Sequence, residues 1–155
     1  MNFSWIDYNP ETMGFIEKWL DEETVNATGL DDGWQDFYEY WLNDENTDYG
    51  ENYWCKAIFE SNIPVAVIAV GLNEGKINIM EIVVKPEERG KGKGRSILNE
   101  LLKNGELIIG RAIECAEAVI YPSNTASKKA FKKAGFVIDY IHEDGDAINY
   151  KYVLR

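Results

Sequence analysis

A basic, glycine-rich loop between two apolar segments decides the fold: residues 82–95 read IVVKPEERGKGKGR. The apolar run before Pro86 has the composition of a strand, and apolar residues from Ile97 onward recur at helical spacing. Glycines at positions 90, 92 and 94 let the backbone wrap closely around a ligand, and free N–H groups at the start of a helix favour an anion. The stretch therefore predicts an anion site where a strand ends and a helix begins.

Two common phosphate-binding loops do not fit this stretch. A Walker A loop needs Gly-Lys-Ser/Thr at a fixed spacing, which is missing here. The dinucleotide motif G-x-G-x-x-G also fails, because Gly92-Lys93-Gly94 is followed by Arg95-Ser96-Ile97. These mismatches argue against nucleoside triphosphates and NAD as ligands. The alternative to an anion site is a solvated basic loop that binds no ligand.

Two motifs in the second half of the chain carry a family resemblance. Residues 89–94, RGKGKG, fit the pattern Q/R-x-x-G-x-G/A, and the preceding residues 82–86, IVVKP, are similar to a strand L-x-V-x-P. Residues 124–136, NTASKKAFKKAGF, look like the helix pattern N-x-x-A-x-x-x-Y-x-x-x-G-F, with Phe131 in the Tyr place. These patterns belong to the GNAT superfamily of acyl-CoA-dependent N-acyltransferases, which the chain resembles.

The resemblance implies a fold, a cosubstrate and a set of binding residues. The implied fold class is α/β (α+β): a mixed, mostly antiparallel sheet of six to seven strands flanked by about four helices, in a single domain over residues 1–155. Acetyl-CoA is the implied cosubstrate, without a metal. Its arm would pair with the strand backbone, its pyrophosphate would bind the loop, Asn124 would bond the arm or cap its own helix, and Phe131 would pack against the arm. The implied cofactor-binding residues are Ile82, Val83, Val84, Arg89, Gly90, Lys91, Gly92, Lys93, Gly94, Arg95, Asn124 and Phe131.

Periodicity and turn signals predict the element order β-α-α-β-β-β-α-β-α-β-β. The first helix follows Asn9-Pro10, which can cap and open a helix, and runs to about Glu23. The second helix begins near Trp34 with an aromatic stripe, and the third fades near Gly105.

A change of periodicity marks the candidate catalytic residue. In the strand over residues 76–85, the apolar positions change parity between Ile79 and Ile82, which predicts a β-bulge near Met80-Glu81. The bulge would put Asn78 and Glu81 on one side of the sheet. The resembled family often carries a glutamate base where this chain has Asn78, so Glu81, the nearest carboxylate, is the candidate general base. A surface or ion-paired strand carboxylate is the alternative.

The general acid is left open by the sequence. Much of the resembled family uses the Tyr of the helix motif, but Phe131 has no proton to give. Tyr121, Tyr140 or solvent remain to protonate the leaving thiolate.

Charge is divided unevenly along the chain. The net charge of −11 argues against general binding to nucleic acid. Residues 1–60 hold 15 acidic and 2 basic side chains, whereas residues 61–155 hold 12 and 14. Because the resemblance puts the first two helices along the acceptor site, we expect Asp31 and Asp32 near its entrance, with the acidic turn at 143–146, and a small cationic amine as acceptor. A solvated acidic surface is the alternative.

Composition bounds the size and the location of the protein. The 155 residues, 45% of them hydrophobic, suit one domain, and the longest apolar run, residues 63–72, is too short to cross a membrane. The N-terminus lacks a secretory signal, and two cysteines with one histidine make neither a disulfide framework nor a metal cluster. We therefore expect a cytoplasmic protein, and leave open whether it is a monomer or a homodimer.

Three functions stay open at this point. The first is an N-acetyltransferase acting from acetyl-CoA on a small cationic amine, and the second is an acetyltransferase of protein N-termini or lysines. The third is a non-catalytic acyl-CoA-binding sensor, which the missing Tyr favours. Acceptor identity and acyl chain preference are not readable from the sequence.

Overall fold

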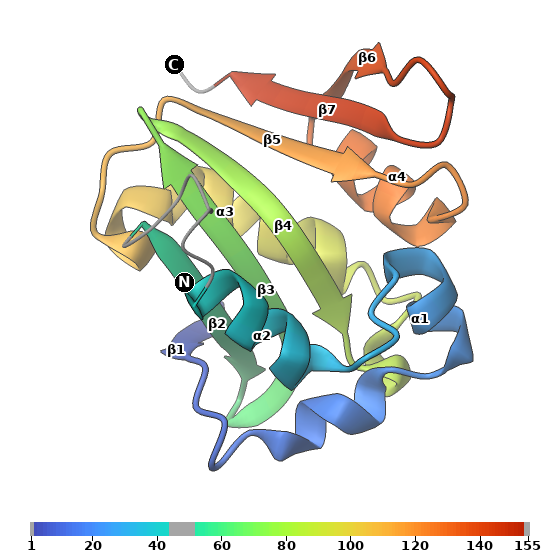
Figure 1. Ribbon diagram of the computed structural model, residues 1–155. Helices are drawn as coiled ribbons and strands as arrows, with labels where there is room; N and C mark the ends of the chain where they lie inside the picture. Colours follow the sequence, from blue (N-terminus) through green and yellow to red (C-terminus); the bar gives the residue numbers. More distant parts are fainter. Residues whose placement is uncertain (1, 44–51, 154–155) are drawn as a thin grey trace.

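The computed structural model describes residues 2–43 and 52–153, which form a seven-stranded sheet with helices on both faces (Figure 1). The strand order across the sheet is β1-β2-β3-β4-β5-β7-β6. The strands are β1 Ser4–Asp7, β2 Tyr53–Glu60, β3 Ile63–Asn73, β4 Lys76–Val84, β5 Cys115–Ile120, β6 Val137–Ile141 and β7 Ile148–Val153. The helices are the 3-10 helices η1 Gly14–Trp19 and η2 Pro86–Glu88 and the α-helices α1 Glu22–Thr28, α2 Trp34–Asn43, α3 Lys93–Ile109 and α4 Thr125–Lys133. The predicted fold class is confirmed.

The middle of the sheet contains a parallel strand pair that separates. Every other neighbouring pair is antiparallel, but β4 and β5 are parallel and pair only where residues 76–79 face residues 115–118. Beyond this point β4 stays beside β3 alone, while β5 continues beside β7. The two strands therefore diverge toward their carboxyl ends (Figure 1).

A β-bulge lies on β4 at the start of this divergence. Ala69 of β3 faces Glu81, while the next residue, Val70, faces Ile79, so Met80 is an additional residue on β4. Ile79 and Ile82 then pack into the same core although their positions differ in parity. The bulge predicted from the sequence is confirmed.

Two apolar cores lie on opposite faces of the sheet. On one face α3 and α4 pack through Leu101 and Phe131, and on the other face η1 and α2 pack through Ile16 and Trp34. Residues 65–72 of β3 are all buried, because this central strand is covered on both sides. None of the helices in the described ranges is long and apolar enough to cross a bilayer.

The predicted first helix is wrong in its bounds. Instead of one helix from Pro10 to about Glu23, the chain forms η1 and then α1. Asp21 causes the break, because its side chain accepts a hydrogen bond from the Thr24 N–H at 2.9 Å and so starts a new helix.

The predicted end of the third helix is correct only in part. The helix is kinked at Asn104, next to the predicted end near Gly105, where the backbone leaves helical geometry with φ −119° and ψ 19°. A second helical segment then continues to Ile109, which is buried against the sheet, and Gly110 ends it in a left-handed backbone conformation.

Candidate active site

A cavity of about 180 Å³ lies where β4 and β5 separate. Helix α1 contributes to its wall from one face of the sheet and α4 from the other. Its lining residues are Ala27, Thr28, Ile79, Met80, Glu81, Ile82, Ala118, Val119, Ile120, Tyr121, Asn124, Ser127 and Phe131. Five of the predicted site residues and candidates therefore meet in one cavity: Glu81, Ile82, Tyr121, Asn124 and Phe131.

Among the described residues that line this cavity, Glu81 is the only acidic one. Burial raises the pKa of its carboxyl to about 8, although the Ile82 backbone N–H donates a hydrogen bond that favours the charged form. Asn78 does not line the cavity, because it lies where β4 is still paired with β5, opposite Glu117. The bulge thus places the Glu81 carboxyl in the cavity lining, and the raised pKa of this carboxyl lies close to neutral pH.

The two tyrosines considered for proton donation lie in different places. Tyr121 lines the cavity at the end of β5, and its hydroxyl is close to the end of α1: a Cβ built on Gly29 would lie 3.8 Å from it. Tyr140 is on β6 outside the cavity lining, where its ring stacks on His142 with centroids 5.3 Å apart. Only Tyr121 of the pair can therefore act inside this cavity.

Phe131 is a buried residue that lines the same cavity. It is 2% exposed, and its ring meets Phe136 edge to face with centroids 4.8 Å apart. Because its ring has no hydroxyl, Phe131 gives the cavity an apolar wall and no proton donor.

The glycine-rich loop forms an open cradle in front of α3. Gly90 and Gly92 have φ of 74° and 76°, in the left-handed region that other residues rarely adopt. A Cβ at either position would meet nothing within 4 Å, so the space in front of the backbone is empty. Gly92 is also the N-cap of α3 and offers no side chain to the first N–H groups of the helix. These donors and the helix dipole suit an anion.

Gly94 also has a packing role, beside its predicted role in the loop. It lies inside α3, and a Cβ there would come within 3.4 Å of the Ala130 Cβ of α4. Its lack of a side chain lets the two helices approach. Sequence reasoning missed this contact, because nothing local indicates which helix packs on which.

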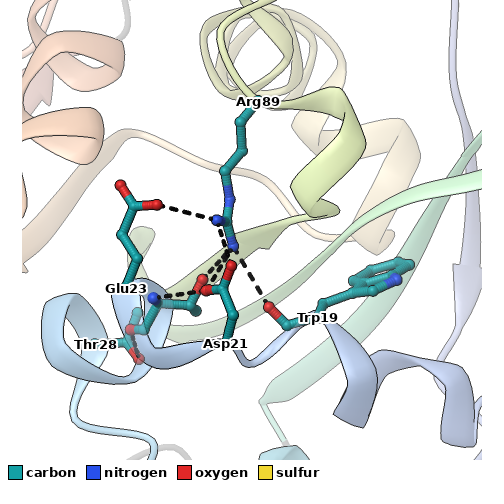
Figure 2. Close-up of polar contacts among 6 residues, drawn as sticks. Trp19, Asp21, Glu23, Thr28 and Arg89 are labelled. Carbon is teal, nitrogen blue, oxygen red and sulfur yellow. Dashed lines mark hydrogen bonds and ion pairs between the residues drawn. The ribbon is translucent and has the colours of Figure 1, made fainter.

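The basic side chains of the loop are mostly paired with acidic residues. Arg89 reaches the start of α1 (Figure 2), Lys93 pairs with Glu60 and with Glu88 at 3.6 Å, and Lys91 pairs with Glu88 at 3.4 Å. Arg95 forms no ion pair within residues 2–43 and 52–153. The guanidinium of Arg89 is therefore turned away from the cradle, contrary to the expectation that the whole loop faces one anion.

The outer half of β4 presents an open edge. Ile82, Val83 and Val84 pair with residues 66–68 of β3, and no described strand faces them from the β5 side. Their backbone groups on this side can pair with an extended ligand as a further strand would.

Asn124 caps α4, as one of its two expected roles requires. Its Oδ1 accepts a hydrogen bond from the Ser127 N–H at 3.1 Å. Ser127, which stands in the alanine place of the helix motif, also lines the cavity. Ser127 is not among the residues expected from the sequence, although its departure from the motif is a signal that marks it.

The acidic residues expected at the entrance lie outside the cavity lining. Asp31 and Asp32 are exposed just before α2, and the nearest part of the chain that does line the cavity is Ala27 and Thr28. The turn at 143–146 is exposed and likewise absent from the lining. From these positions the carboxylates can attract a cationic ligand toward the cavity through their electrostatic field. In the described part of the chain, no three His, Cys, Asp or Glu side chains gather into a metal-binding group.

The parallel strands separate beside an anion cradle at the start of a helix, an arrangement that can hold an extended ligand with a phosphate group. Residues 11–136 match the acetyltransferase (GNAT) family, and the chain belongs to this family. No curated protein matches the chain significantly in sequence.

Solved acetyltransferases share the fold. Spermidine N-acetyltransferase from Vibrio cholerae, in complex with CoA and spermine, has a TM-score of 0.72 at 12% identity and covers 99% of this chain and 96% of its own. The aminoglycoside acetyltransferase AAC(6′)-Ib with coenzyme A has a TM-score of 0.74 at 16% identity, covering 97% and 94%. The ribosomal-protein-S18-alanine N-acetyltransferase from Escherichia coli has a TM-score of 0.65 at 18% identity, covering 98% and 94%. The chain is thus an N-acetyltransferase of the GNAT family with acetyl-CoA as cosubstrate. The acceptors named for the three solved structures differ from one another.

Proposed function

We propose that the protein transfers an acetyl group from acetyl-CoA to a primary amine of a small cationic acceptor. The observation that carries the proposal is that half-buried Glu81 lines the cavity between β4 and β5, on the strand that leads to the glycine cradle. The two cysteines are free, which supports a reducing compartment such as the cytoplasm.

The residues present fit acetyl-CoA. The left-handed Gly90 and Gly92 and the uncapped start of α3 would hold the pyrophosphate, and the open edge of residues 82–84 would pair with the pantetheine arm. Asn124 and Phe131 would border the arm from α4. Acetyl-CoA supplies an activated acetyl thioester to the cavity.

Glu81 serves as the general base in this proposal. With a pKa of about 8, its carboxylate is a stronger base than an ordinary glutamate and is closer in pKa to an alkylammonium of about 10. It takes the proton from the amine as the C–N bond forms and the C–S bond breaks, and passes the proton to solvent. Tyr121 donates its hydroxyl proton to the departing thiolate and recovers one from solvent.

Replacing Tyr121 by phenylalanine should lower kcat about tenfold while changing the KM for acetyl-CoA by less than about twofold. The effect is moderate because a thiolate with a pKa near 8.5 leaves without full protonation. The measurement is the release of free thiol at saturating acetyl-CoA. Tyr140→Phe removes a similar hydroxyl outside the cavity and should leave kcat unchanged, and equal kcat values for both variants would remove Tyr121 from the mechanism.

The cationic acceptor is supported by charge. Residues 1–60 carry most of the acidic side chains, and α1, from this segment, contributes to the cavity wall. A negative field attracts amines that carry several charges and raises their rate of encounter. The names of two structural neighbours point to polyamine and aminoglycoside acceptors, whereas the third names a ribosomal protein.

Turnover with a panel of amines tests the function. The panel contains a polyamine, an aminoglycoside, a singly charged amine and peptides with a free N-terminus or lysine, with free thiol as readout. We expect turnover with the polycations, and their kcat/KM should fall about tenfold between 20 mM and 500 mM salt because the field is screened. The singly charged amine should change less than about twofold.

The Asp31→Asn, Asp32→Asn double variant should reduce this salt dependence for the polycations. Equal salt dependence for all amines would leave the acidic half as a solvated surface. Turnover of peptides alone would replace the small acceptor by a protein. Tight acetyl-CoA binding without turnover on any amine would favour the acyl-CoA sensor.

A further inference from the structure

The side chain of Arg89 joins the coenzyme loop to the start of α1 (Figure 2). Its two terminal nitrogens donate to the two oxygens of Asp21 at 2.8 and 3.2 Å, as a planar fork binds a carboxylate. It also donates to the Trp19 carbonyl at 3.4 Å, to Glu23 at 3.3 Å and to the Thr24 hydroxyl. One half-buried guanidinium thus contacts four residues around the beginning of a single helix.

Asp21 binds this guanidinium and caps α1 with the same carboxylate. Its Oδ1 accepts the Thr24 N–H at 2.9 Å, and the hydrogen bond from Arg89, with that from the Thr24 backbone, holds the pKa of Asp21 well below its usual range. The charge of Asp21 is therefore retained throughout the neutral range. The fork and the cap form one arrangement, because losing the carboxylate charge weakens both.

The other end of α1 contributes to the cavity wall. Thr28 donates its hydroxyl proton to the Thr24 carbonyl at 2.7 Å, and its oxygen accepts the Leu30 N–H at 3.3 Å. Ala27 and Thr28 both line the cavity. Because α1 has only seven residues, it has little stability of its own and depends on the contacts at its ends.

We propose that Arg89 is a positioning residue that fixes α1, a wall of the acceptor site, to the coenzyme loop, so that coenzyme bound at the loop orders this wall. The inference rests on the proposed function, because it takes the cradle as the coenzyme site and the cavity as the acceptor site. The backbone of Arg89 begins the loop while its side chain ends on α1, so a loop held by phosphates holds the helix as well. If Arg89 and Asp21 formed only a structural ion pair, they would stabilise the fold, but coenzyme binding would not change the order of α1.

Hydrogen exchange with and without CoA separates these two roles. The amides of Val25 and Gly29 report on α1, since they donate to Asp21 O at 2.9 Å and to Val25 O at 2.8 Å. In the wild type, saturating CoA should slow their exchange about fivefold or more. In Arg89→Gln and Asp21→Asn this slowing should fall below about twofold. Gln still satisfies the loop motif, and Asn still caps a helix, so both variants keep the local fold.

Two control variants remove similar groups elsewhere. Glu23→Gln removes an 84% exposed carboxylate at the rim of the cluster. Arg111→Gln removes a guanidinium that donates to Asn52 at 2.9 Å and lies over the Trp54 ring, between α3 and β5. Both should retain the wild-type slowing. With an amine accepted in the panel, Arg89→Gln should raise its KM about tenfold and lower kcat less than about threefold.

The outcomes are distinguishable. CoA that binds by calorimetry without slowing α1 exchange in the wild type, or that slows it equally in Arg89→Gln, overturns the inference and leaves the proposed function intact. Absence of CoA binding to the folded wild type overturns the proposed function, and the inference with it.

Discussion

Glu81→Gln should lower kcat of acetyl transfer about 10²- to 10³-fold, because glutamine cannot accept the proton of the amine. The wild-type kcat should rise with pH and level off above about pH 8, where the carboxyl is ionised. The variant should lack this rise. Calorimetry should show that acetyl-CoA binds the variant as it binds the wild type, because the bulge and the loop are unchanged.

Glu117→Gln is the matched control for this prediction. Glu117 is a partly buried strand carboxylate on β5, paired with Lys76 at 3.5 Å and absent from the cavity lining. Its replacement should leave kcat and the pH profile as they are. A wild-type rate and pH profile in Glu81→Gln would exclude the base assignment.

The free energy of unfolding should also depend on the titration of Glu81. The folded-state pKa of Glu81 lies above its unfolded value of 4.5, so the folded protein holds a proton that the unfolded chain has released. The contribution of Glu81 to the free energy of unfolding is therefore largest below about pH 4.5 and declines up to about pH 8. Urea unfolding of Glu81→Gln, compared with the wild type at pH 5 and pH 8, should show the variant gaining relative stability at the higher pH.

Local signals predicted the parts of the site that local chemistry determines. The glycine cradle follows from Gly90 and Gly92 between a strand and a helix, and the bulge follows from the parity change between Ile79 and Ile82. Asp21 is a residue type that caps helices, so the start of α1 has a local signal, but Asn9-Pro10 is a second start signal twelve residues earlier and predicts one longer helix. The sequence therefore predicts the helix start at Asn9-Pro10 and misses the one at Asp21.

The remaining features depend on contacts between distant segments. Arg89 and Asp21 are 68 residues apart, and no local pattern indicates that a loop arginine will turn to a helix cap instead of an anion. The approach of Gly94 to Ala130 likewise requires the packing of α3 on α4. The choice of Tyr121 over Tyr140 required knowing where β4 and β5 separate. Sequence spacing leaves such choices open, because they are made by the tertiary arrangement.

Gly92→Val should weaken acetyl-CoA binding at least about 30-fold in Kd. The backbone at Gly92 has φ of 76°, and the space in front of it is open, which is the room that a pyrophosphate would use. The valine side chain would fill this space and would keep the anion away from the first N–H groups of α3. Isothermal calorimetry with acetyl-CoA measures the loss directly.

Strain alone does not account for the expected loss, because the other end of the same helix offers a matched position. Gly110 caps α3 with φ 75° and ψ 16°, Gly92 has φ 76° and ψ 16°, and a Cβ at either glycine meets nothing within 4 Å. Gly110→Val should therefore cost a similar stability, about 1–2 kcal/mol for a left-handed non-glycine residue, and leave the Kd unchanged. A similar Kd in both valine variants, with similar melting temperatures, would mean that the pyrophosphate does not use the cradle. A 30-fold difference between them would assign the effect to the space at Gly92, because the two variants share the backbone conformation, the helix and the substituted residue.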